Sequence, residues 1–245
     1  MIPLDRRSKD LRLATIDLAK ANGGYHLGGS FSCVEILRAV SELDGFPERF
    51  IMSKGHGCWP FYVLLRERGL NPKLEGHPSR DPANGVTFTT GSEGHGLPAA
   101  LGLAWGLRMI EKEQRVTVLI GDGECQEGTT WESMLIAGKH RLPVTCIVDF
   151  NGIQGSGRSD DILPMRNAVC AVARTSGWWL HHCSGNSIDD MREALKIDTR
   201  VAPGPWLIMA HTIKGAGVSF MEDEPCWHAR WLDPEHEAIA RKELA

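Results

Sequence analysis

The sequence predicts an α/β protein, with a doubly wound, mostly parallel β-sheet in a single domain that spans residues 1–245. Two short apolar runs, 116–120 and 144–150, are rich in β-branched residues and typical of buried parallel strands. Residues 128–140 between them have apolar side chains at near-helical spacing, which indicates a β-α-β unit. Helical and strand-like segments continue to alternate along the chain, and this alternation favours a sheet with helices on both faces.

The helices are predicted from apolar residues at helical spacing and from residues that favour helix ends. Pro98 suits the first turn of the fourth helix. Asp233 followed by Pro234 is a cap and a first helical residue, so a final helix begins there. The predicted helices are 8–21, 32–43, 55–68, 97–114, 128–140 with Thr129 or Thr130 as its N-cap, 165–175, 188–196 and the one after Asp233.

The strands are predicted from short apolar runs bounded by turn residues. Besides 116–120 and 144–150, the runs 178–180 and 206–211 fit this pattern. A glycine-rich loop follows Asn151 and separates the second strand from the next helix.

Composition points to a cytoplasmic enzyme domain. The net charge is −4, so nothing in the composition favours binding to nucleic acid or to an anionic membrane. No apolar run approaches the length of a membrane span, and the N-terminus lacks the apolar part of a signal peptide. The seven cysteines contain no CxxC pair, which favours reduced thiols over a zinc site or a disulfide framework.

Polar residues follow the two strands of the β-α-β unit. Asp122 lies after the first strand, within Gly-Asp-Gly, and Asn151 follows the second. Because the carboxyl ends of neighbouring parallel strands meet at one edge of a sheet, these two side chains should emerge together. Carboxylate and amide oxygens suit Mg²⁺ that is shared with phosphate oxygens, and Gly123 allows backbone N–H groups to approach an anion. The pattern therefore predicts a site for a metal-bound diphosphate.

With these residues in place, the chain resembles the transketolases. Gly-Asp-Gly at 121–123 and Asp-Phe-Asn-Gly-Ile-Gln at 149–154 resemble the thiamine diphosphate signature of that family. Histidine-containing segments agree with the family in order over nearly the whole length. They are Tyr25-His26-Leu27-Gly28-Gly29-Ser30, Ser53-Lys54-Gly55-His56-Gly57, Glu75-Gly76-His77-Pro78, Thr90-Gly91-Ser92-Glu93-Gly94-His95-Gly96 and Trp227-His228.

The resemblance implies the N-terminal subunit of a split, two-component transketolase, because 245 residues suffice for only the diphosphate-binding domain of a full chain. Thiamine diphosphate and Mg²⁺, or Ca²⁺ or Mn²⁺ in its place, are the implied cofactors. The implied reaction moves a two-carbon ketol unit from a ketose donor to an aldehyde acceptor. The implied partner is a C-terminal subunit with the pyrimidine-binding domain, in an α₂β₂ assembly.

Five histidines fall on family positions, and the resemblance gives each a role. His26 and His228 would act as acid/base or polarising groups beside the reacting hydroxyls. His77 would hydrogen-bond the donor's terminal hydroxyl, and His56 would contact the diphosphate or the substrate edge. His95 would line the loop on the pyrimidine side.

The resemblance also assigns the metal and cofactor contacts. Asp122, Asn151 and the backbone carbonyl of Ile153 would bind the metal ion, and Gly123 would give the diphosphate an amide contact. The Gly91 carbonyl would face the cofactor's amino group. Glu127 matches an acidic residue at the family's subunit interface, or is simply a glutamate favoured at a helix start. Lys214 would reach an anionic ligand, or is a solvated lysine.

Glu93 departs from the family pattern, which usually has an aliphatic residue near the cofactor ring at this position. A carboxylate there could stabilise the cationic thiazolium, pair with a cation of the partner or disfavour the usual reaction. Residues 229–232 also differ from the usual sequence after the last active-site histidine. Both departures favour a specialised ketol transfer.

Three other functions fit parts of the pattern. The α subunit of a 2-oxo acid dehydrogenase shares some of these motifs, as does deoxyxylulose phosphate synthase, and a non-catalytic structural or regulatory subunit would keep the fold without turnover. The histidine series disfavours the dehydrogenase, and the chain length disfavours an intact synthase.

Overall fold

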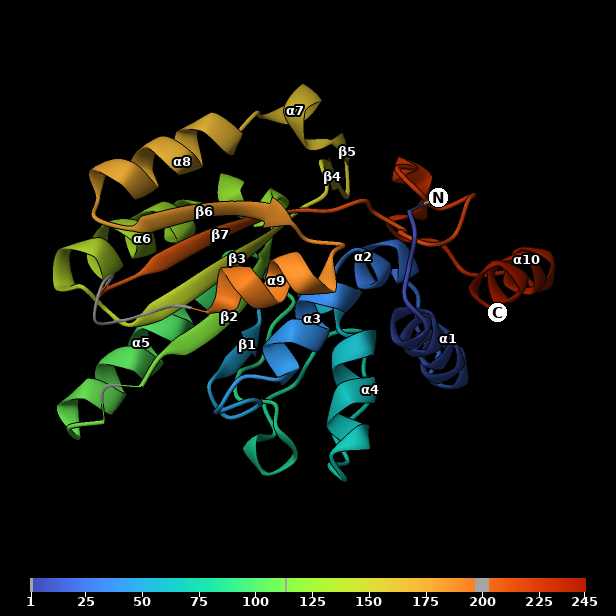
Figure 1. Cartoon of the computed structure of the whole chain (residues 1–245), viewed down its shortest axis with the longest axis horizontal. Helices are drawn as coiled ribbons and strands as arrows, with labels where there is room; N and C mark the ends of the chain where they lie inside the picture. Colours follow the sequence, from blue (N-terminus) through green and yellow to red (C-terminus); the bar gives the residue numbers. More distant parts are fainter. Residues whose placement is uncertain (1, 113, 197–202) are drawn as a thin grey trace.

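The computed structural model describes residues 2–112, 114–196 and 203–245, and a parallel sheet forms their centre (Figure 1). Short runs of largely apolar residues, β-branched above all in β2 and β3, form its strands, which are buried on both faces except at the edge strand β6. The five strands pair in the order β1 (Phe50–Met52), β2 (Val116–Gly121), β3 (Val144–Phe150), β7 (Trp206–His211) and β6 (Trp179–Ser184).

Helices lie on both faces of the sheet, as the predicted doubly wound fold requires. Side chains of β2 alternate between the two layers, since Val118 and Ile120 pack in one apolar cluster and Leu119 packs in the other. The first cluster includes α5 (Gly96–Met109), α6 (Gly128–His140) and α8 (Arg166–Thr175). The second includes α1 (Arg6–Ala21), α2 (Leu27–Ser32), α3 (Val34–Ser41), α4 (Trp59–Glu67) and α9 (Ile188–Leu195).

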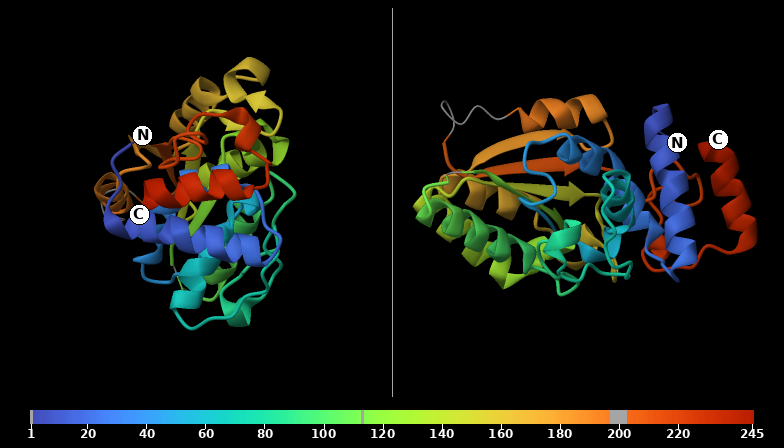
Figure 2. Two further views of the ribbon diagram at one scale, coloured as in Figure 1. Left: turned by 90° about the vertical axis from the view of Figure 1, so that its right-hand side faces the viewer. Right: turned by 90° about the horizontal axis from the view of Figure 1, so that it is seen from below.

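The two ends of the chain lie together at one end of the molecule. Helix α10 (Pro234–Leu244) packs beside α1 (Figure 2). Asp233 caps α10 by accepting a hydrogen bond from the backbone N–H of His236, as predicted. No helix in the described ranges has the length and apolar character needed to span a bilayer.

Most predicted elements are confirmed, and the differences have local causes. The helix predicted over 97–114 ends at Met109, because Glu111 has left-handed backbone geometry with φ 57°. The helix predicted over 32–43 is α3, Val34–Ser41, and the sequence did not predict the short helix α2, which ends just before Cys33. The strand predicted over 178–180 extends from Trp179 to Ser184.

The N-cap predicted for α6 is wrong. Glu127 occupies the N-cap position, while the hydroxyls of Thr129 and Thr130 donate to the backbone carbonyls of Gly94 and Glu124. The two threonines therefore fasten neighbouring loops to the start of this helix.

Short elements fill the loops that surround the carboxyl ends of the strands. The glycine-rich segment after Asn151 contains a small antiparallel hairpin and one helical turn, which the sequence did not predict. These elements are β4 (Ile153–Gln154), β5 (Gly157–Arg158) and α7 (Ser159–Ile162), and the 3₁₀ helices of the fold are η1 (Gly55–Gly57), η2 (Pro82–Asn84), η3 (Gly123–Gln126) and η4 (Pro225–Trp227).

Candidate active site

A polar cavity lies at the carboxyl ends of β1, β2, β3 and β7, where an open parallel sheet binds its ligands. The register pairs Gly121 with Asp149 and Phe150 with His211, so the loops that follow these strands start at the same edge. The cavity is lined by side chains from all of these loops, including Lys54, His56, Asp122, Asn151, Lys214 and His228.

The Asp122 carboxylate is buried and holds two loops together. It accepts hydrogen bonds from the backbone N–H groups of Gly123, at 2.9 Å, and of Gly152, at 2.7 Å. The Ser159 hydroxyl donates to it at 3.1 Å. Burial and the nearby Asp149 carboxylate raise the pKa of Asp122 to about 6, so a cation beside it would favour the charged form.

Asn151 and Ile153 bring two more oxygen atoms to the same cavity. The Asn151 side-chain oxygen accepts from the Ile153 N–H at 3.1 Å, and the Ile153 carbonyl accepts from the Lys214 ammonium at 2.9 Å. Since the Gly152 N–H donates a hydrogen bond to Asp122, the loop 151–153 is held against the end of β2.

The donor set fits a hard cation that is shared with an anion. Within the described ranges, no cluster of three His, Cys, Asp or Glu residues suits a metal ion. The set formed by Asp122, Asn151 and the Ile153 carbonyl has one carboxylate and two neutral oxygens, a small number of protein ligands that is typical of Mg²⁺ bound with phosphate. Lys214 already places a positive charge on one of these oxygens.

A buried ion pair lies behind the cavity, and the sequence analysis did not identify it. The Lys54 ammonium contacts the Asp149 carboxylate, and both side chains are almost fully buried, at 1% and 0% exposure. Burial works to lower the pKa of Lys54, but the Asp149 charge outweighs it and the pKa is raised. Ser32 and Thr212 also donate to Asp149, so this carboxylate joins α2, β3 and the loop after β7.

Glu124 is a second buried acid that the sequence analysis missed. Its carboxylate accepts from the backbone N–H groups of Gly121, at 2.8 Å, and Gly94, at 3.0 Å, and from the Ser53 hydroxyl. Burial raises its pKa to about 7. Glu124 thus connects three loops around the cavity, whereas in the sequence it is only one more polar residue after Gly-Asp-Gly.

Four of the five predicted histidines form one cluster. The ring centroid of His26 lies 5.6 Å from that of His56, 6.2 Å from His77 and 5.2 Å from His228. His56 and His228 are also 5.2 Å apart. His95 lies outside this cluster, exposed at the N-terminus of α5.

Hydrogen bonds fix complementary tautomers on two of these rings. His26 Nδ1 lies 2.6 Å from the His228 carbonyl, which can only accept, so this nitrogen carries the hydrogen and Nε2 is left as an acceptor. His228 Nδ1 lies 2.9 Å from the Lys214 ammonium, which can only donate, so in the neutral ring the hydrogen is on Nε2. The pair therefore offers one proton acceptor and one proton donor.

Burial among cations keeps these rings neutral. Burial and the Lys214 charge lower the pKa of His228 to about 3. Burial also lowers the pKa of His26, and it lowers that of His56 well below its usual value. Burial lowers the pKa of Lys214 to about 8, so this lysine remains largely charged at neutral pH.

Gly91 lies beside His77, and Glu127 is close enough to Glu93 to act on its charge. Gly91 has φ 134°, and a Cβ there would lie 3.1 Å from the His77 ring, so the position requires glycine. Glu127 is exposed, and its side chain packs against Gly94.

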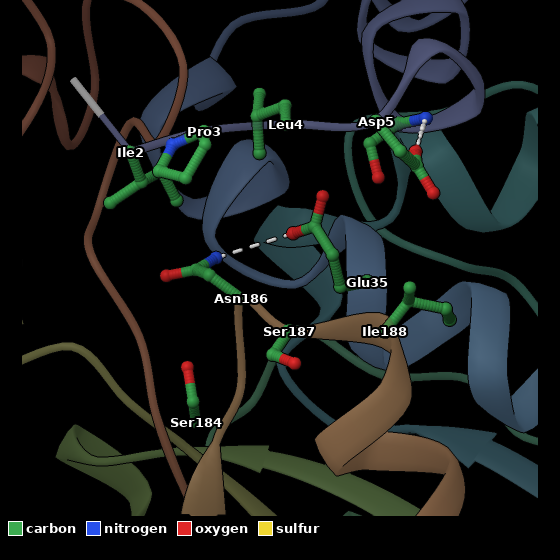
Figure 3. Close-up of a pocket in the computed structure, with 10 residues that line it drawn as sticks. Ile2, Pro3, Leu4, Asp5, Glu35, Ser184, Asn186, Ser187 and Ile188 are labelled. Atoms are coloured by element: carbon green, nitrogen blue, oxygen red, sulfur yellow. Dashed lines mark hydrogen bonds between the residues drawn. The ribbon is translucent and has the colours of Figure 1, made fainter.

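A separate pocket lies beside Asn186, a residue that holds the loop of Lys214 in place (Figure 3). It lies between the N-terminal segment, α3 and the start of α9. Asn186 on its wall donates to Glu35 at 3.3 Å and accepts from the Ile213 N–H at 2.7 Å. Asn186 thus holds the residue before Lys214, a role that the sequence analysis did not predict.

Comparison with known proteins agrees with this geometry. The family model described as transketolase, thiamine diphosphate binding domain, matches residues 45–245. An apulose-4-phosphate transketolase subunit from Actinobacillus succinogenes is 34% identical, covering 98% of this chain and 95% of its own. A 6-deoxy-6-sulfo-D-fructose transketolase subunit from Clostridium sp. (strain MSTE9) is 31% identical, covering 99% of this chain and 96% of its own.

Longer, single-chain relatives match over part of their length. The transketolase of Rattus norvegicus is 30% identical over 91% of this chain, which corresponds to 39% of the rat protein. The crystal structure of transketolase from Campylobacter jejuni has the same fold, with a TM-score of 0.82 and 24% identity over 98% of this chain and 42% of its own. On the family match and the identity to transketolase subunits, this chain belongs to the transketolase family, in the part that forms the thiamine diphosphate binding domain.

Proposed function

We propose that this chain is the diphosphate-binding subunit of a two-component transketolase that transfers a ketol unit from a ketose to an aldehyde. The observation that carries the proposal is one cavity with two functional ends. At one end are the oxygens of Asp122, Asn151 and Ile153, and at the other is the histidine cluster. A diphosphate cofactor with a reactive ring suits such a cavity.

Thiamine diphosphate, when bound, supplies the carbon–carbon bond chemistry that amino acid side chains lack. Asp122, Asn151 and the Ile153 carbonyl would hold a divalent cation, Mg²⁺ or Ca²⁺ or Mn²⁺ in its place. Gly123 would present backbone to the diphosphate. Lys214 would turn from the Ile153 carbonyl toward the phosphate oxygens, because a cation on that carbonyl would repel the ammonium.

The histidines would transfer protons and orient the substrate. His26 Nε2 is a free acceptor and His228 Nε2 a donor, so together they can remove a proton from one hydroxyl and polarise another oxygen. His77 would bind the terminal hydroxyl of the donor, and His56 the diphosphate or the substrate edge. Gly91 and His95, on the loop before α5, would face the cofactor's pyrimidine side.

The outward face of helix α5 supports an obligate partner. This face carries Gly102, Trp105, Gly106 and Met109, and Arg108 is the one charged residue of the helix, so α5 is more apolar than a solvent-exposed helix normally is. A Cβ on either glycine would meet no atom of the described residues within 4 Å, so those residues give no steric reason for glycine there. Close approach of another polypeptide would give one.

The apolar face continues onto α6 and reaches the cavity mouth. Leu135 and Ile136 on α6 are 56% and 46% exposed. Helices α5 and α6 begin beside Glu93 and Glu127, so a protein that covers these helices would also close the cavity. The occupant we propose is a C-terminal transketolase subunit, which would supply the remaining length of the single-chain relatives, in a cytoplasmic α₂β₂ assembly with Glu127 at the interface.

Charging this face should weaken the complex. Met109→Asp on α5 and Leu135→Asp on α6 are each expected to lower affinity for the partner by about tenfold or more, because each removes a buried apolar contact and buries a charge. Equilibrium binding measured by analytical ultracentrifugation tests this. Ile239→Asp on α10, which is also exposed, should leave the affinity unchanged. Equal affinity in all four proteins would exclude this face as the interface.

The enzyme assay requires the chain together with its partner. The complex, purified with its native partner, should form ketol-transfer products only with thiamine diphosphate and a divalent cation, and chelation by EDTA should stop it. A donor screen that includes xylulose 5-phosphate, apulose 4-phosphate and 6-deoxy-6-sulfofructose identifies the substrate. Efficient turnover of xylulose 5-phosphate with ribose 5-phosphate would rule out a specialised role, and full activity of the isolated chain would contradict the two-component proposal.

A further inference from the structure

The carboxylate of Glu93 faces the cavity without a partner of its own. Glu93 lines the cavity, and within the described ranges it makes no hydrogen bond. The Nδ1 atom of His56 lies 3.8 Å from Oε1 of Glu93, too far for a hydrogen bond. A partly buried carboxylate in such a place can pair with a cation or a hydrogen-bond donor of a bound ligand.

The two lysines of the cavity are already engaged elsewhere. Lys54 pairs with Asp149, and Lys214 donates to the Ile153 carbonyl and to His228. Burial keeps His56 and His228 neutral, so neither ring balances the charge of Glu93. Burial and the repulsion from Glu127 raise the pKa of Glu93, and the more distant charges of Lys54 and Lys214 do not offset them.

Glu93 also lies between the two ends of the cavity. Its Oε2 is 3.6 Å from the position that a Cβ on Gly123 would occupy, next to the predicted diphosphate contact. Its other oxygen faces His56, which belongs to the histidine cluster. A ligand that extends from the metal-binding oxygens to the histidines must therefore pass this carboxylate.

We propose that Glu93 is a binding site for the positively charged ring of the cofactor, and that it makes this chain selective for a cationic ring over a neutral one of the same shape. The inference rests on the proposed function, in which thiamine diphosphate occupies the cavity. The thiazolium ring is a permanent cation, and it joins the diphosphate to the reacting end. An ion pair in a partly enclosed cavity is stronger than one in water, so the Glu93 charge should raise the affinity for the cationic ring.

The effect of the Glu93 charge on affinity is measured by comparing two ligands in matched variants. The ligands are thiamine diphosphate and its thiophene analogue, which has a neutral ring and the same diphosphate. Each is titrated by calorimetry, with Mg²⁺, into the complex of the chain with its native partner. Glu93→Gln keeps the shape and removes the charge, Glu93→Leu removes both, and Glu48→Gln removes an exposed charge that lies outside the cavity lining.

The unmodified complex should prefer the charged ligand, and the ratio of the two dissociation constants should fall by about tenfold in both Glu93 variants, which corresponds to about 1.4 kcal/mol. Glu48→Gln should leave the ratio unchanged. Glu93 is partly exposed, with 42% of its side chain accessible, so both variants should fold, and thermal unfolding checks this.

Two results would overturn the inference. Unchanged affinities for both ligands in the Glu93 variants would mean that Glu93 does not contact the ligand. An equal change for both ligands would mean that the carboxylate acts on the diphosphate or on a cation of the partner. Failure of the unmodified complex to bind either ligand would count against the proposed function itself, which separates the two claims.

Discussion

Replacing Asp122 by alanine should abolish cation-dependent binding of thiamine diphosphate, with the affinity of the assembled complex falling by about 100-fold or more. The carboxylate is the one charged group among the three proposed metal ligands, so its loss removes the main attraction for the ion. The substitution also leaves the donors of Gly123, Gly152 and Ser159 without an acceptor. Isothermal titration with and without Mg²⁺ measures the effect.

Asp122→Asn separates the loss of charge from the loss of structure. Asparagine keeps the shape and can still accept one of the backbone hydrogen bonds, so this variant should fold with only a moderate loss of stability. Its affinity for the cofactor should still fall sharply, because an amide replaces the anionic ligand. Cofactor binding by Asp122→Asn that is equal to the unmodified protein, at the same Mg²⁺ concentration, would show that Asp122 does not bind the metal.

Breaking the Lys54–Asp149 pair should cause the largest loss of stability of any single change near the site. Removing one partner leaves a charge uncompensated in a nearly inaccessible position, which costs about 3–5 kcal/mol. Asp149→Ala should cost more than Lys54→Met, because Asp149 also accepts from Ser32 and Thr212. Urea unfolding followed by circular dichroism, at fixed protein concentration, gives the free energies.

An exposed ion pair provides the matched control. Arg192 and Glu42 pair on the surface, where solvent screens the charges, so Glu42→Gln should barely move the unfolding midpoint. An Asp149→Ala protein as stable as Glu42→Gln would show that the buried pair is not formed in solution.

The strand-end geometry of the site could be predicted from the sequence because it depends on local patterns. Asp122 and Asn151 directly follow apolar runs, and the parallel register of β2 and β3 brings them to one edge. The histidine cluster was predicted through the resemblance, since His26, His77 and His228 lie far apart in the sequence and no local pattern links them. The roles of all these residues remain predictions.

The residues that support the site were harder to predict, because their partners are distant in the sequence. Lys54 and Asp149 are 95 positions apart, and Ser53 and Glu124 are 71 apart. One signal was present, since Asp149 interrupts an otherwise apolar strand and a charge there must be paired. Nothing in the sequence indicates that Asn186 holds the loop of Lys214.

The predicted elements differ from the structure where an element is too short to show a period, contains glycine, or ends before its apolar pattern does. The strand β1 has only three residues, too few for a recognisable period. Glycines at 28 and 29 hide the helix α2, because glycine is a poor helix former that packing can override. The apolar pattern of α5 continues past Met109, but the backbone turns at Glu111.

Anomalous scattering of Mn²⁺ in crystals of the complex grown with thiamine diphosphate tests the metal site directly. We expect one manganese ion about 2.0–2.3 Å from a carboxylate oxygen of Asp122, the side-chain oxygen of Asn151 and the backbone carbonyl of Ile153, with Lys214 moved off that carbonyl. A bound cofactor whose manganese ion lies elsewhere, or touches none of these three oxygens, would contradict this expectation.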